Sequence, residues 1–359
     1  MCALHCGARL SPSLVFPAAC CIILYYKMHS YLIEMLECPV CHGELAWTVT
    51  ERRGNRIEKA EAHCVACAAT YPVREGIGLF LTPDLPRNDL WEQVDSQLVQ
   101  YLRENPEVER QLLDVPLDTL APADQFFRAL ALEERGEYAQ AKAAKDLANT
   151  GLYTPEHLAC SDSQVNYALG LLSASDGPIV DLASGQGHLV ERLAHRLERP
   201  IVATDFSPRV LRRDRRWLKF FGLYDRVSLL AFDARCTPFK NGAVETLTTY
   251  LGLPNIEQPG DLLRELRRIV AGTFLAISHF FPEKDEANAA TIRQAGLSAL
   301  LFRRSALEHF ASAGWQVDVA NVCQAKARPT PRGVLLEGAG IDALPVAETM
   351  LEWCVFVAR

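Results

Sequence analysis

The segment between residues 179 and 205 constrains the fold more than any other part of this 359-residue chain. Two short apolar runs, Ile179–Leu182 and Ile201–Thr204, contain no alternating polar residues. Strands of this kind are typical of a parallel sheet that is covered by helices on both faces. Gly185 and Gly187 lie between them, at the turn from the first strand into a helix-like stretch. The segment therefore predicts a β-α-β unit of an α/β sheet with right-handed crossovers.

The alternation of strand and helix patterns continues to the C-terminus. Helices are predicted over 187–197, 208–221, 261–270 and 285–313, and strands over 227–232, 244–249 and 274–279. Two further strand-like runs, Trp315–Ala325 and Met350–Ala358, have only a loop-like stretch between them. That ending predicts an antiparallel hairpin at the edge of the sheet.

The residues around the glycine turn indicate what kind of ligand it would bind. Asp205 ends the second strand, eighteen residues beyond Gly187, and a carboxylate there can accept hydrogen bonds from both hydroxyls of a ribose. Ala183 and Val190 stand where a dinucleotide fingerprint has its first and third glycines. Asp181, inside the first strand, would repel a pyrophosphate but could hold an amino group. The loop therefore favours a nucleoside that carries an amino acid over a dinucleotide.

Four motifs in this half of the chain together resemble class I S-adenosylmethionine-dependent methyltransferases. Residues 180–187 (Val-Asp-Leu-Ala-Ser-Gly-Gln-Gly) resemble motif I, and residues 203–207 (Ala-Thr-Asp-Phe-Ser) resemble motif II. Residues 232–234 (Phe-Asp-Ala) resemble the motif after the third strand, and residues 249–255 resemble the end of the fourth. The resemblance covers about residues 176–359. It implies a Rossmann-like seven-stranded methyltransferase sheet with an antiparallel C-terminal hairpin.

The resemblance also implies roles for individual residues. Asp205 would bind the ribose and Phe206 would pack on the adenine, while Asp233 would take the adenine amino group and Ala234 would offer its backbone N–H. The full set implied for S-adenosylmethionine is Asp181, Ala183, Ser184, Gly185, Gly187, Asp205, Phe206, Ser207, Asp233, Ala234 and Tyr250.

No dedicated catalytic base is evident, and methyl transfer from a sulfonium needs mainly in-line positioning of the acceptor. His188 and Tyr250 lie near the expected methyl position and are the catalytic candidates. For His188 the alternative is a helix-start residue that faces solvent or the carboxylate of the cofactor. His279, at the end of the fifth strand, is similarly placed.

Four cysteines form two C-x-x-C pairs, Cys38 with Cys41 and Cys64 with Cys67, separated by β-like sequence. Paired thiolates on two turns are typical of tetrahedral zinc sites, and four of them leave no open position for water. A structural Zn²⁺ is therefore predicted in a β-rich zinc-ribbon domain over residues 35–84; disulfide redox centres are the alternative. The surrounding residues resemble a zinc-ribbon family that activates RNA and protein methyltransferases and is also found fused to methyltransferases.

The rest of the chain carries fewer signals. Residues 85–175 have helical patterns, among them a helix predicted over 161–173 with Ser161 or Asp162 as its cap, and are predicted to form a linker or lid region before the domain at 176–359. Residues 1–34 are predicted to be a mis-annotated or disordered extension, with Met28 or Met35 as the start. The apolar run within it, Leu14–Tyr26, is too short to span a bilayer, so no membrane association is predicted. The cysteine usage indicates a reducing, cytoplasmic location.

The predicted function is S-adenosylmethionine-dependent methyl transfer to a small-molecule acceptor, which the sequence does not identify. An RNA methyltransferase, using the zinc ribbon and the basic stretch Arg209–Lys219 to bind phosphates, is the alternative. The net charge of −7 argues against broad nucleic-acid binding. A non-catalytic scaffold that binds S-adenosylmethionine is a further alternative, and the sequence leaves the oligomeric state open.

Overall fold

The structure is a computed structural model that describes residues 28–82 and 90–359. The predictions for residues 1–27 lie outside this range. Among the described residues, no helix combines the length and the apolar character needed to cross a membrane.

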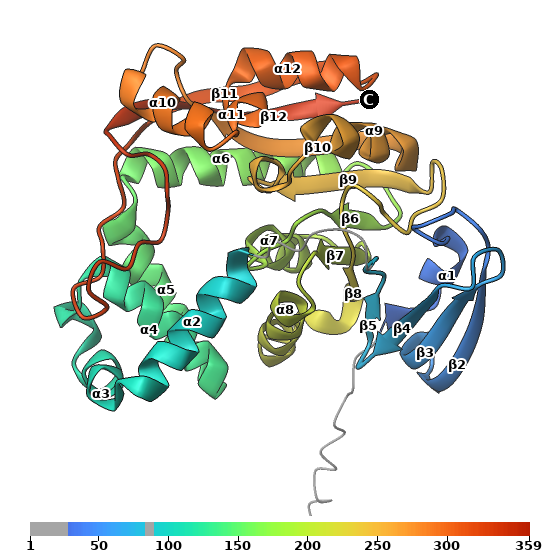
Figure 1. Cartoon of the computed structure of the whole chain (residues 1–359), viewed down its shortest axis with the longest axis horizontal. Coiled ribbons are helices and arrows are strands. Elements are labelled where there is room, and N and C mark those ends of the chain that lie inside the picture. Colours follow the sequence, from blue (N-terminus) through green and yellow to red (C-terminus); the bar gives the residue numbers. More distant parts are fainter. Residues whose placement is uncertain (1–27, 83–89) are drawn as a thin grey trace, which may run out of the picture.

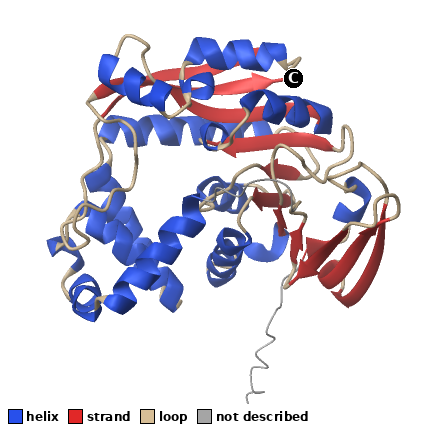
Figure 2. Cartoon of the chain, viewed as in Figure 1, coloured by secondary structure: helices blue, strands red, loops and turns tan. Residues whose placement is uncertain are grey.

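One twelve-stranded sheet runs through the described chain (Figure 2). Its order is β1-β3-β4-β5-β8-β7-β6-β9-β10-β12-β11, with β2 paired to β3. In chain order the strands are β1 (Met28–His29), β2 (Leu45–Arg53), β3 (Arg56–Cys64), β4 (Thr70–Arg74), β5 (Ile77–Leu79), β6 (Ile179–Asp181), β7 (Ile201–Asp205), β8 (Val227–Ala231), β9 (Val244–Tyr250), β10 (Val270–Phe280), β11 (Val317–Ala327) and β12 (Thr349–Ala358).

The helices fall into an N-terminal group and a group that alternates with the strands. The first group is α1 (Leu32–Met35), α2 (Leu90–Glu104), α3 (Pro106–Asp114), α4 (Pro122–Arg135), α5 (Tyr138–Leu152) and α6 (Pro155–Leu172). The second is α7 (His188–Arg196), α8 (Pro208–Phe220), α9 (Pro259–Ile269), α10 (Glu286–Gln294), α11 (Ser298–Leu301) and α12 (Arg303–Ser312). In Figure 1, α2–α5 gather on one side of α7 and α8, and the β-rich N-terminal module on the other.

Strands β8, β7, β6, β9 and β10 are parallel, and β12 lies antiparallel between β10 and β11. The predicted α/β class and the antiparallel C-terminal hairpin are therefore confirmed. The sheet has twelve strands instead of the predicted seven, because the five strands β1–β5 of the N-terminal module join β6–β12 through the parallel pairing of β5 with β8 over Ile77–Leu79. Through β5, the β-rich module and the α/β sheet become one continuous sheet.

Two buried clusters lie on the two faces of this sheet. Side chains of α6, α7, α8 and α10 contribute to one of them, and side chains of α9 and α12 to the other. The connection between β8 and β9 contains no helix, and the N-terminal module packs there, where Leu36 forms a β-bridge with Phe239. Met28 and Leu32 are buried in the same cluster.

Two predicted helices differ from the structure. The stretch 285–313 is three helices instead of one, and Gly296 ends the first with a left-handed φ of 72°. The helix predicted to start at Ser161 begins earlier: Pro155 is in its first turn and the Thr154 hydroxyl accepts the His157 N–H at 3.2 Å. A threonine cap followed by proline is a helix start signal.

A long connection between β11 and β12, residues 328–348, lies against the helices and is held there by Asp124 of α4. Asp124 is 1% exposed, and its carboxylate accepts the backbone N–H groups of Val334, Leu335 and Leu336 at 2.9–3.3 Å. We call residues 328–348 the hairpin loop. A buried carboxylate with three N–H donors is a strong anchor, because each donor would otherwise lack a partner.

Replacing Asp124 with alanine is expected to lower the free energy of unfolding by about 2–3 kcal/mol, since it removes the acceptor of buried N–H groups. Urea denaturation followed by circular dichroism measures the change. Asp118→Ala, the same replacement at an exposed position shortly before α4, should stay within about 0.5 kcal/mol of the parent chain. Equal stability of the two variants would show that the hairpin loop is held in another way.

Candidate functional site

The glycine loop lies where the carboxyl ends of β6, β7 and β9 meet. Ala183, Gly185 and Gly187 all have left-handed φ values of 52°, 55° and 70°. Glycine adopts this conformation without strain, and Gly187 is also the residue from which α7 begins. Ser184 ties the loop to β7, because its N–H donates to the Thr204 carbonyl at 2.8 Å. The predicted residues of motif I thus form a tight turn that leads into a helix N-terminus.

Asp205 faces this loop from the end of β7. Its Oδ2 accepts the Gly185 N–H and its Oδ1 accepts the Ser207 N–H, both at 3.0 Å. Ser207 is buried and caps α8, since its hydroxyl accepts the Val210 N–H at 3.3 Å. Phe206, between the two, is half-buried. The acid, the glycine turn and the adjacent aromatic ring therefore share one edge of the sheet.

Asp181 lies beneath the loop and is 1% exposed. The Thr248 hydroxyl donates to its Oδ1 at 2.8 Å. Burial, together with the neighbouring Asp205 carboxylate, raises the pKa of Asp181 to about 7. Asp181 is thus poised to change protonation close to neutral pH, within the ligand edge of the sheet.

Asp233 and Ala234, after β8, are both buried. The sequence did not indicate that Arg235 would hold the Asp233 carboxylate: its Nη2 donates to Oδ2 at 2.7 Å and its Nε to Oδ1 at 3.0 Å. An adenine amino group would have to share this carboxylate with the guanidinium. The sequence shows an arginine two residues beyond the acid, but it does not show that this side chain turns toward the carboxylate.

A cavity of about 370 Å³ opens beside the glycine loop. Residues of α5, α6, the ends of β9 and β10 and the hairpin loop surround it. The polar and charged residues of its lining include Lys145, Tyr153, His157, Ser184, Gln186, His188, Tyr250, His279 and Asp342. The predicted lid region therefore supplies one wall of the cavity, although its sequence contains no recognisable motif.

The two catalytic candidates lie together at this cavity. The rings of His188 and Tyr250 are 4.9 Å apart between centroids, and the Tyr250 hydroxyl is 2.6 Å from the Ser161 hydroxyl. Burial raises the pKa of Tyr250 to about 12, so its phenol keeps its proton at neutral pH. His188 is exposed at the start of α7. Tyr250 can therefore donate or accept a hydrogen bond, but it is a poor source of a phenolate.

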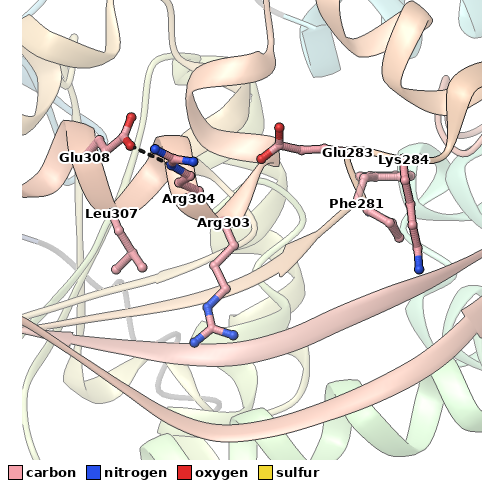
Figure 3. Close-up of a pocket in the computed structure, with 8 residues that line it drawn as sticks. Phe281, Glu283, Lys284, Arg303, Arg304, Leu307 and Glu308 are labelled. Carbon is pink, nitrogen blue, oxygen red and sulfur yellow. Dashed lines mark hydrogen bonds and ion pairs between the residues drawn. The ribbon is translucent and has the colours of Figure 1, made fainter.

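A second hollow, of about 730 Å³, lies where the segment after β10 meets α12 (Figure 3). Its charged side chains are largely paired with acids of the same chain. Arg304 donates to Glu308 at 3.0 Å, which Figure 3 marks, and Arg303 lies 2.6 Å from Glu352. This hollow contains none of the predicted site residues.

The four cysteines meet at one point of the N-terminal module. Their sulfur atoms all lie within 4.8 Å of one another, with 3.6 Å between Cys38 and Cys67 and 3.4 Å between Cys41 and Cys64. A tetrahedral zinc site with bonds of about 2.3 Å puts sulfurs about 3.8 Å apart, so the cluster fits such an ion. Gly43 leaves room beside it, because an added Cβ would lie 2.9 Å from the Ala66 Cβ and 3.1 Å from the Cys64 sulfur.

The histidines next to these cysteines have other partners. Nδ1 of His42 is 2.8 Å from Glu37, and Nδ1 of His63 is 3.2 Å from the Thr70 hydroxyl. Within the described residues, the four cysteines are the one group of three or more histidine, cysteine or acidic side chains arranged to hold a metal ion.

The basic stretch on α8 is engaged inside the molecule. Arg209 and Arg216 lie 3.8 and 3.7 Å from Glu134, Arg213 lies 3.5 Å from Glu133, and Arg215 lies 2.6 Å from Glu75. Four of the six basic residues between positions 209 and 219 thus pair with acids of α4 or of the N-terminal module. Their charge is largely neutralised before any phosphate could approach.

Comparison with known families agrees with this geometry. Residues 179–272 match the family model described as "Methyltransferase domain". The chain contains a class I methyltransferase domain. Residues 29–76 match the family model "Trm112p-like protein", so a Trm112p-like, zinc-ribbon type module precedes the methyltransferase domain. The sequence resemblance to a class I methyltransferase with an N-terminal zinc ribbon is therefore confirmed.

Among curated proteins, the methyltransferase domain is similar to enzymes named for quinone biosynthesis. A demethylmenaquinone methyltransferase of Thermus thermophilus is 36% identical over 106 residues, which are 29% of this chain and 47% of that protein. A ubiquinone/menaquinone biosynthesis C-methyltransferase of Shewanella baltica is 25% identical over 124 residues, 33% of this chain and 49% of that protein. The chain thus spans about half the length of these relatives. The solved YcgJ protein of a Bacillus species covers 54% of the chain, and 97% of its own length, at 14% identity and a TM-score of 0.42.

Proposed function

We propose that this protein transfers a methyl group from S-adenosylmethionine to a small-molecule acceptor. The proposal rests on the position of Asp205, which accepts the Gly185 N–H of the glycine loop, and on the cavity that this loop lines. A volume of about 370 Å³ is at the lower end of the range for small-molecule sites. The quinone methyltransferases that the chain resembles, by their names, also support a small acceptor.

The proposed cofactor contacts follow from the chemistry of the loop. Asp205 would exchange its backbone partners for the ribose hydroxyls, with Phe206 against the adenine and Asp233 near its amino group. Asp181 would attract the methionine ammonium, and Ala183, Ser184, Gly185 and Gly187 would surround the methionine portion. When bound, the sulfonium supplies the electrophilic methyl group. The role of the protein would then be to exclude water and to orient the acceptor near Tyr250 and His188.

We further propose that the four thiolates hold a structural Zn²⁺. Four sulfurs complete the coordination of the ion, so it would take no part in the reaction. The units proposed are the zinc ribbon, the helical lid of residues 85–175 and the methyltransferase domain of residues 176–359. A reducing compartment such as the cytoplasm fits the free thiols of the cluster.

Two other functions have less support. An RNA methyltransferase would need the arginines of α8 for phosphates, and most of them are paired with acids. A cofactor-binding scaffold would need no acceptor space, whereas the cavity extends from the glycine loop to α6, β10 and the hairpin loop.

Titration calorimetry with S-adenosylmethionine, followed by detection of S-adenosylhomocysteine with a panel of small acceptors, tests the proposal. Binding together with acceptor-dependent product is the expected result. No binding of the cofactor would overturn the proposal, and binding without turnover of any acceptor would favour the scaffold.

Cofactor affinity is expected to rise between about pH 6 and pH 8. The pKa of Asp181 is raised to about 7 by burial, so the carboxyl is mostly neutral at pH 6 and ionised at pH 8, when it can attract the ammonium group. Calorimetry at three pH values measures the effect. Asp181→Asn, which cannot ionise, should flatten the profile; an equally steep rise in this variant would assign the titration to another group.

A further inference from the structure

One wall of the cavity contains two histidines packed among aromatic rings. His157 lies in the first turn of α6 and His279 near the end of β10, with their ring centroids 6.4 Å apart. Trp353 pairs with His279 across the strands, and its ring lies 5.0 Å from each imidazole. Tyr153 stacks on His157 at 4.9 Å. We call these four residues the histidine wall.

Both imidazoles are neutral at physiological pH. Burial lowers the pKa of His157 to about 4, and burial together with the neighbouring His157 lowers that of His279 to about 3. A neutral imidazole has one nitrogen that donates and one that accepts a hydrogen bond. The charged residues on the cavity lining are Lys145 of α5 and Arg328 and Asp342 of the hairpin loop; Asp342 accepts the Tyr153 hydroxyl at 2.9 Å, and none of the three belongs to the wall. The two imidazoles of the wall can therefore donate and accept hydrogen bonds to a ligand while carrying no charge.

His279 has unused hydrogen-bonding capacity. Its Nδ1 is buried and has no hydrogen-bond partner among residues 28–82 and 90–359, and the same holds for Nε1 of the fully buried Trp353 behind it. An unsatisfied buried nitrogen is unfavourable, and native proteins rarely keep one without a reason. The same imidazole lines the cavity, and a bound ligand would reach it through Nε2, since Nδ1 itself has almost no accessible surface.

We propose that His157 and His279 are positioning residues that orient an uncharged, planar methyl acceptor through a hydroxyl group of that acceptor. A hydroxyl can donate to the bare nitrogen of one imidazole and accept the N–H of the other. The aromatic rings and apolar residues such as Phe281 and Leu351 provide the planar, uncharged surroundings. A charged acceptor would lose its hydration here without gaining a counter-charge from the wall. The inference rests on the proposed function, because it takes this cavity as the acceptor site.

The test compares two probes that differ by one hydroxyl, 1-naphthol and naphthalene. Their affinities are measured by fluorescence titration of the full chain with saturating S-adenosylhomocysteine. The parent chain is expected to bind 1-naphthol about tenfold more tightly than naphthalene, since one satisfied hydrogen bond is worth up to this factor. In His157→Phe and His279→Phe the preference should fall to less than about twofold, whereas S-adenosylmethionine affinity should stay within about twofold.

Two further variants keep the experiment decisive. His279→Asn retains a donor and an acceptor and should recover part of the preference, which a role in packing alone would not explain. His309→Phe makes the same replacement on α12, where the ring bonds to the Ser305 carbonyl, and should behave like the parent chain.

An unchanged preference in both phenylalanine variants would overturn the inference, and so would a parent chain that binds neither probe or binds them equally. Failure to bind S-adenosylmethionine would instead overturn the proposed function, so the two failures are distinguishable.

Discussion

Replacing Asp205 with alanine is expected to weaken S-adenosylmethionine binding at least about 100-fold. Hydrogen bonds from hydroxyls to a carboxylate are worth about 1.5–3 kcal/mol each, and the replacement would remove the two proposed with the ribose. The same carboxylate holds the N–H groups of Gly185 and Ser207, so the glycine loop also loses its fixed position. Titration calorimetry measures the affinity. Asp205→Asn keeps one acceptor oxygen and should give an intermediate loss.

The matched control for Asp205→Asn is Asp225→Asn, at an exposed acid before β8. This variant should bind the cofactor like the parent chain. Thermal melts show whether the Asp205 variants are folded. A folded Asp205→Ala chain that binds within about threefold of the parent would remove the main support for a nucleoside site.

Loss of the metal from the four-cysteine site is expected to destabilise the methyltransferase domain as well as the module. The binding energy of a structural zinc is largely folding energy. The module and the α/β sheet share one buried cluster and one sheet. We expect Cys64→Ser, or treatment with a strong chelator, to lower the melting temperature by about 10 °C or more.

Calorimetric melting together with metal analysis tests this expectation. Cys323→Ser, at a half-buried cysteine on β11, is the matched control and should change the melting temperature by no more than a few degrees. If Cys64→Ser loses its metal but melts like the parent chain, the cluster does not stabilise the fold. A purified chain without any metal would contradict the zinc assignment itself.

The parts of the site that the sequence predicted are those held by local geometry. The glycine turn, the acid at the end of β7 and the spacing of the cysteines each depend on residues close together in the chain or on one strand order. The helix break at Gly296 and the cap at Thr154 were readable in the same way, although both were missed.

The cavity was not predictable, because it depends on contacts between distant segments. Asp124 holds a backbone segment more than 200 residues away, and the Tyr153 hydroxyl donates to Asp342 at 2.9 Å. The hairpin loop has no periodicity that would reveal its place against α4 and α5. The pairing of Arg235 with Asp233 likewise depends on a rotamer, which no pattern of residue types specifies.

The addition of β5 to the sheet could not be predicted from the sequence either, because a strand of three residues, Ile77–Leu79, is too short to show a pattern. Gly78 carries the only trace of it: a Cβ there would lie 2.7 Å from a methyl carbon of Leu230 on β8. A residue with a side chain would therefore force the Leu230 side chain to shift. In the sequence this glycine is indistinguishable from one in an ordinary turn.

The short β5–β8 pairing has a thermodynamic consequence. Three paired strand residues alone would bind two separate proteins to each other only weakly. Their association would then depend on the concentration of each protein in the cell. Here both surfaces belong to one polypeptide, so docking is intramolecular and does not depend on the concentration of a second chain. The chain thus always holds one module for each methyltransferase domain, and dilution cannot separate them.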